Sequence, residues 1–197
     1  FEEAQRAAAD ALSIVGPDDV LRRARIKQQQ GLAARALGRY DECLAIWDEV
    51  VTDYAALGET EAAGELCWEM GYQLIWLSRF ADAFEIYERG LKALDGSRGP
   101  AMAALVSSTG LLLGFSGADG MHEAGLVQLA EAEDIARECA DERNLGRVNW
   151  ARCVLGWSYG QVPESARAGQ AAVEHLRRAG DLWSVTDALA WMAFPVG

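Results

Sequence analysis

A sequence pattern with a period of about 40 residues constrains the fold of this chain more than any other feature. An aromatic residue, two mostly acidic residues and a small residue begin at Phe1, Tyr40 and Phe80, so the three starts are almost evenly spaced. A similar interval separates four small residues: Gly31, Gly71, Gly110 and Cys153. A period of this length indicates that one supersecondary unit is stacked repeatedly along the chain.

Each unit reads as two helices. Residues 22–37 and 60–77 are rich in strong helix formers and end at Gly38 and Ser78, where a tight turn is easily made. The acidic residues at the start of the second helix complement the positive end of its dipole. The apolar residues that follow recur at helical spacing of three and four: Leu44, Trp47, Val50 and Val51. No segment has the strict alternation of a half-buried strand, so the sequence predicts an all-α fold.

The residues at equivalent places in two units carry a family resemblance. They are Gly31, Gly38, Tyr40, Cys43, Trp47 and Val50 in one unit, and Gly71, Ser78, Phe80, Ala83, Tyr87 and Gly90 in the next. On these residues the chain resembles a tetratricopeptide array, although the usual unit has about 34 residues. Its longer units are similar to the C-terminal repeats of bacterial signalling ATPases and transcriptional regulators. Residues 114–120 depart from the pattern, because a Gly-rich segment replaces the short turn and the expected aromatic residue is missing.

The resemblance implies a right-handed α-solenoid of antiparallel helix pairs, with about ten helices. We expect one solenoid over residues 1–197, formed by a half-repeat at 1–18, repeats at about 19–58, 59–97, 98–140 and 141–180, and a half-repeat at 181–197. The last helix is predicted to end near Phe194. Because both ends are half-units without a polar cap, and the chain does not begin with Met, we expect a piece of a longer protein or self-association through the ends.

In solenoids of this kind the first helix of each pair lines the concave surface. Projecting those helices from their central small residue places several large side chains inward. The predicted groove is lined by Gln28, Arg35, Trp68, Tyr72, Trp76, Phe115, Trp150 and Trp157. Apolar aromatic surfaces of this kind mark binding sites. The alternative is that these aromatic residues only fill the space between helices, as large rings commonly do.

Basic residues offer anchors for an anionic group on a ligand. Arg25, Arg35 and Arg147 are predicted at the edge of the groove, although a solvated helix face would also explain them. Gln28 and Leu32 stand where related co-chaperones carry the Lys and Asn of a carboxylate clamp, which argues against that partner class. We expect an apolar or amphipathic ligand, neutral or basic over most of its length, with an amphipathic helix favoured over a small aromatic effector.

The sequence offers no catalytic or metal site, and we expect neither enzymatic activity nor a cofactor. His122 follows a Gly-rich segment, and His175 is predicted to face outward on a helix. Neither belongs to a recognisable triad or metal-ligand arrangement. Residues 110–120 are rich in glycine but lack the Lys and Ser or Thr of a phosphate loop, so a flexible turn is the expected structure.

Composition narrows the partners further. The 30 acidic and 18 basic residues leave a net charge of −12, which repels polyanions and argues against direct nucleic-acid binding. No apolar run reaches the length of about 18 residues that a membrane span needs. Four widely spaced cysteines in apolar contexts are expected to be reduced and buried, which favours a cytoplasmic location.

Two hypotheses remain open. In the first, the chain is an interaction or sensing scaffold that binds a peptide, a partner helix or a small apolar effector within a larger bacterial regulatory protein. In the resembling signalling ATPases, such arrays are thought to convert ligand binding into release of autoinhibition. In the second, it is a structural spacer or self-association module, and every aromatic residue belongs to the core.

Overall fold

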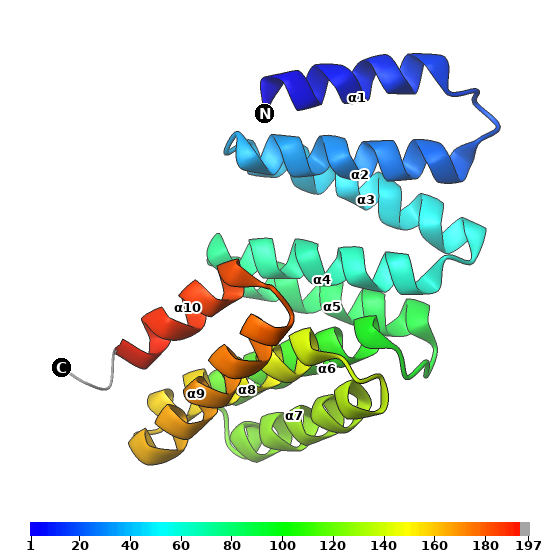
Figure 1. Cartoon of the computed structure of the whole chain (residues 1–197). Helices are drawn as coiled ribbons and strands as arrows, with labels where there is room; N and C mark the ends of the chain where they lie inside the picture. Colours follow the sequence, from blue (N-terminus) through cyan, green and yellow to red (C-terminus); the bar gives the residue numbers. More distant parts are fainter. Residues whose placement is uncertain (194–197) are drawn as a thin grey trace. The chain divides into compact units, whose positions relative to one another are not determined.

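The computed structural model describes residues 1–193, which form ten α-helices and no β-strand (Figure 1). In chain order these are α1 (Glu2–Ile14), α2 (Val20–Ala36), α3 (Tyr40–Leu57), α4 (Thr60–Trp76), α5 (Phe80–Leu94), α6 (Pro100–Phe115), α7 (Met121–Glu138), α8 (Glu142–Ser158), α9 (Val162–Arg178) and α10 (Leu182–Ala193). The prediction of an all-α chain with about ten helices is therefore confirmed. The predicted helix end near Phe194 lies outside the described residues.

Left-handed residues separate the paired helices at the predicted turns. Gly38 and Ser78 have φ values of 75° and 59°. The N–H of Gly38 donates to the carbonyl of Arg35, and Ser78 makes the equivalent bond to Ile75. These bonds satisfy carbonyl groups that a helix C-terminus otherwise leaves open, so the chain reverses direction within a short turn.

The chain divides into two compact units, unit 1 (Phe1–Leu94) and unit 2 (Asp95–Gly197). In unit 1, α2 lies beside α3 and α4 beside α5 (Figure 1), while α3 contacts α4 and α1 contacts α2. Large side chains that fill the core of this unit include Trp47, Val50, Tyr54, Leu66, Leu74 and Tyr87.

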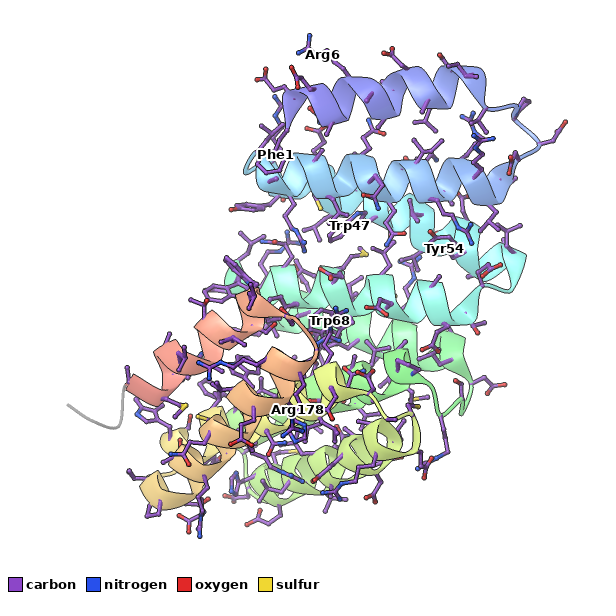
Figure 2. The ribbon with its side chains drawn as sticks, viewed as in Figure 1. Phe1, Arg6, Trp47, Tyr54, Trp68 and Arg178 are labelled. Atoms are coloured by element: carbon purple, nitrogen blue, oxygen red, sulfur yellow. The ribbon has the colours of Figure 1, made fainter. Side chains whose placement is uncertain are left out.

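A glycine in the first helix of each pair of unit 1 packs against an aromatic ring of the second. A Cβ atom on Gly31 would overlap the indole of Trp47, and one on Gly71 would overlap the ring of Tyr87. Trp47 lies at the α2–α3 interface (Figure 2), where its indole Nε1 donates to the Gln28 carbonyl at 3.1 Å. The absence of a side chain at Gly31 and Gly71 thus lets the paired helices enclose a large ring.

In unit 2, α6 packs on α7 and α8 on α9, α6 contacts α8, and α10 packs on α9. The sequence of α6 contains no charged residue, and most of its side chains are buried. The prediction that residues 110–120 form a flexible turn is wrong for their first half, because Gly110 and Gly114 lie inside α6. A Cβ on Gly110 would approach the carbonyl oxygen of Gly125 in α7 to 2.9 Å, so glycine here allows close helix packing.

None of the helices within residues 1–193 is both long enough and apolar enough to cross a bilayer.

Candidate functional site

Three aromatic residues, one helical turn apart, form a continuous row along α4. The rings of Trp68 and Tyr72 are stacked, with centroids 5.2 Å apart and planes at 13°. Tyr72 and Trp76 meet edge to face, with centroids 6.3 Å apart and planes at 80°. Both arrangements are favourable for aromatic pairs. We refer to Trp68, Tyr72 and Trp76 as the α4 aromatic row.

Exposure increases along this row toward the C-terminus of α4. Trp68 retains only 8% of its accessible surface, Tyr72 is half-buried, and Trp76 is 58% exposed. Trp68, labelled in Figure 2, therefore fixes the row in the protein and does not present an open face. Its predicted role in lining an open groove is wrong, whereas Trp76 offers a broad apolar surface to a partner.

The opposite side of α4 explains why the row faces away from α5. Gly64, Cys67, Gly71 and Leu74 are buried on that side, and Gly71 receives the ring of Tyr87. Because residues on a helix are separated by about 100°, this packing directs the α4 aromatic row toward the other side of the helix.

The polar residues predicted beside the groove on α2 already have internal roles. Nη1 of Arg35 lies 2.6 Å from Oε2 of Glu69 in α4, and the guanidinium lies 5.2 Å from the centroid of the Trp47 ring. Gln28 accepts a hydrogen bond from the Tyr54 hydroxyl at 2.8 Å. Both side chains therefore link helices within unit 1.

Arg25, a predicted anchor for an anionic group, is exposed. Burial raises the pKa of the nearby Tyr54 phenol, and the positive charge of Arg25 opposes that shift. Arg25 forms no ion pair within residues 1–193, so its guanidinium is available to a partner.

In unit 2 the predicted groove residues also differ in exposure. Phe115 is 49% and Trp157 39% exposed, and the Trp157 ring meets Trp191 edge to face at 5.8 Å. Trp150 instead packs against a buried cluster that includes Val173 and Leu176. Near the C-terminal end of the first helices, the side chains of Trp76, Phe115 and Trp157 are thus exposed. Trp68 and Trp150, which each lie three residues before the central small residue, are covered by neighbouring side chains.

The predicted anchor Arg147 donates to Asn144 Oδ1 at 3.0 Å within α8. Asn144 in turn donates to the carbonyl of Pro100 at 2.8 Å and is buried. Arg147 is half-buried and takes part in this network, so the structure gives it a role in holding α8 within unit 2.

The two histidines and four cysteines are distributed along the chain from α3 to α9. The Nδ1 atom of His175 in α9 lies 2.7 Å from Oε2 of Glu142 in α8, and both side chains remain partly exposed. The ring of His122 contacts that of Tyr159, with centroids 3.8 Å apart and planes tilted by 34°. Burial raises the pKa of Cys43 to about 12 and that of Cys67 to about 11, which disfavours the reactive thiolate. Cys139 is partly exposed, contrary to prediction. Within residues 1–193, no group of three or more His, Cys, Asp or Glu side chains is arranged so that it could hold a metal ion.

One feature of unit 1 had no signal in the repeat pattern. A small cleft of about 270 Å³ lies where α1 meets the start of α2 and is lined by Ala11, Ile14, Val15, Gly16, Asp19, Arg22 and Ile26. Arg23 closes the end of α1 by donating to the carbonyls of Leu12 and Val15. The cleft lies beside the bend at residues 15–19, where Gly16 and Pro17 favour a turn and Asp19 caps α2 by accepting from the Arg22 N–H.

No protein-family model matches this chain, and no curated protein is significantly similar to it. Its function is therefore inferred from the residues themselves.

Proposed function

We propose that this chain is a protein-interaction module, built as a tetratricopeptide-like solenoid, that binds a peptide or partner helix on the α4 aromatic row. The observation that carries the proposal is Trp76, which is 58% exposed at the end of a row anchored by the buried Trp68. A rigid, anchored aromatic side chain gives a large apolar contact area at small entropic cost, as interface hot spots do.

The spacing of packing partners supports the tetratricopeptide-like part of the proposal. Gly31 contacts Trp47 and Gly71 contacts Tyr87, and each ring follows its glycine at the same separation in the sequence. Two helix pairs of unit 1, α2–α3 and α4–α5, thus repeat the same contact as well as the same sequence pattern. A place within a larger cytoplasmic regulatory protein of bacteria belongs to this proposal and rests on the family resemblance.

Capture of partners by the purified chain tests the proposal. Trp76→Ala should lose most of the captured protein, because it removes the exposed end of the α4 aromatic row. Trp183→Ala is the matched control, since Trp183 is 71% exposed on α10 and lies outside the predicted groove. Equal capture by the wild type and both variants, with helix content unchanged by circular dichroism, would remove the α4 surface from consideration.

The second candidate, a spacer or self-association module, is favoured by the burial of Trp68 and by the internal contacts of Gln28 and Arg35. In that case sedimentation would give either a monomer that captures no partner or a concentration-dependent oligomer. Trp76→Ala would leave both properties unchanged.

A further inference from the structure

Two carboxylates share the face of α4 that carries the aromatic row. With about 100° of rotation per residue, Glu65 and Glu69 fall within an arc of about 100° that also holds Trp68, Tyr72 and Trp76. Both Glu side chains are half-buried. The proposed binding surface therefore combines aromatic rings with negative charge.

Glu69 pairs with an arginine of the chain itself, Arg35 of α2. Its carboxylate holds the Arg35 guanidinium at 2.6 Å, and the same guanidinium lies 5.2 Å from the centroid of the Trp47 ring. A carboxylate and an indole thus hold one arginine of the chain itself. Planar guanidinium groups suit this combination, since they pair with carboxylates and also stack on aromatic faces.

Glu65 offers a similar opportunity with no arginine in place. Within the part of the chain that the structure describes, Glu65 forms neither an ion pair nor a hydrogen bond, although it lies one turn from Glu69 and from Trp68. The exposed ring of Trp76 lies on the same face. Glu65 and Trp76 are about 16 Å apart along α4, so a partner helix laid along this face would meet a carboxylate at one end and an exposed ring at the other.

We infer that the α4 face recognises arginine side chains of a basic amphipathic helix, an inference that rests on the proposed function and specifies its ligand. The apolar side of such a helix would cover Trp76, and an arginine about three turns away would pair with Glu65. The net charge of −12 attracts a basic peptide at long range and increases its association rate.

A fluorescent amphipathic peptide of leucine, alanine and arginine is the test probe, and the matched probe carries citrulline in place of each arginine. Citrulline keeps the planar shape and removes the charge. By anisotropy, the wild type should bind the arginine peptide about tenfold more tightly, as expected for several partly exposed charge contacts. Trp76→Ala should weaken binding of both peptides about tenfold, because it removes shared apolar area.

Glu65→Gln should reduce the preference for arginine about threefold while leaving affinity for the citrulline peptide unchanged. Glu85→Gln is the control, since Glu85 is exposed on α5 and its substitution changes the net charge equally. Circular dichroism checks that every variant is folded.

The outcomes separate the two claims. If Trp76→Ala weakens both peptides but Glu65→Gln behaves like Glu85→Gln, recognition of arginine is overturned while the binding surface stands. If Trp76→Ala binds both peptides as well as the wild type does, the proposed surface itself is wrong. Failure of the wild type to bind the arginine peptide also overturns the inference.

Discussion

One helix pair of each unit, α4–α5 in unit 1 and α8–α9 in unit 2, has a glycine at its central contact, but the glycine lies in the first helix of one pair and in the second helix of the other. In α4 and α5 of unit 1, the small residue Gly71 is in the first helix and the large Tyr87 in the second. In α8 and α9 of unit 2, the glycine is in the second helix, where a Cβ on Gly169 would approach Cys153 Sγ to 3.1 Å and overlap the side chain of Met192. Gly71 and Tyr87 have the same separation in the sequence as Cys153 and Gly169. The spacing of the contact is therefore the same in both pairs, but the smaller residue is in the first helix of one pair and in the second helix of the other.

This difference explains why the repeat pattern is clear in unit 1 and uneven in unit 2. A packed interior requires that the combined volume of facing side chains fit the space, and either helix can supply the larger one. In unit 2, glycine in α9 leaves room for Met192 of α10, and Gly110 of α6 lies against Gly125 of α7. A pattern that expects glycine in the first helix therefore loses its signal at the α8–α9 pair, whereas Gly110 of α6 keeps it.

Gly71→Leu should give the largest effect, about 3 kcal/mol of lost stability, since the added side chain must displace the buried ring of Tyr87. Urea denaturation followed by circular dichroism measures the change. A variant as stable as the wild type would show that the repeat register assigned to unit 1 is mistaken.

Alanine at the equivalent contacts sharpens the comparison. Gly71→Ala should cost about 2 kcal/mol because a rigid buried ring stands in the way, whereas Gly169→Ala should cost about 1 kcal/mol or less because the flexible Met192 can move. The free energies of unfolding of the two variants, measured side by side, test this order. Equal losses would mean that the nature of the facing side chain does not matter.

Contacts between first helices differ in chemistry as well. Arg35 of α2 and Glu69 of α4 form an ion pair in unit 1, while in unit 2 the Tyr159 hydroxyl, just after α8, donates to the Gly114 carbonyl of α6 at 2.8 Å. We expect Arg35→Met and Tyr159→Phe each to cost about 1 kcal/mol at low salt. Only the Arg35→Met loss should shrink in about 1 M salt, where charges are screened. Salt-independent losses for both would contradict the assignment.

The smallest effect concerns acid stability. Hydrogen bonding to His175, together with the charge of Arg178, lowers the pKa of Glu142 in unit 2 from its ordinary value near 4.5. A lowered pKa contributes stability above the ordinary value, and that contribution is lost as the pH falls through the value in the folded protein. Glu142→Gln should therefore reduce stability at pH 6 and have little effect at pH 3. Melting temperatures at both pH values test this, and a difference that persists at pH 3 would contradict it.

The sequence predicts the helices better than it predicts the surfaces. Apolar spacing and the turn residues Gly38 and Ser78 are local signals, and the helices end where those signals occur. Helical projection gives the direction of a side chain but not the depth at which its neighbours cover it. Trp68 and Trp76 point to the same side of α4, yet they are 8% and 58% exposed.

Contacts between residues far apart in the sequence account for what the sequence does not predict. His175 faces Glu142, which lies 33 residues earlier, and no local pattern encodes that pair. Gly114 lies in a Gly-rich segment that resembles a turn, but a Cβ there would approach Leu155 to 2.7 Å, so its place in α6 depends on packing against α8. Trp150 is held by a cluster drawn from α9 and α10.

The central claim is that the exposed end of the α4 aromatic row binds a partner, and fluorine NMR of the protein labelled with 5-fluorotryptophan tests it most directly. The chain has seven tryptophans, and the signal that is missing from the spectrum of Trp76→Phe is that of Trp76. On addition of the arginine peptide, the Trp76 signal should shift and lose its sensitivity to solvent, while that of the exposed Trp183 stays in place. A Trp76 signal that does not move while the peptide binds would place the binding surface elsewhere and contradict the account.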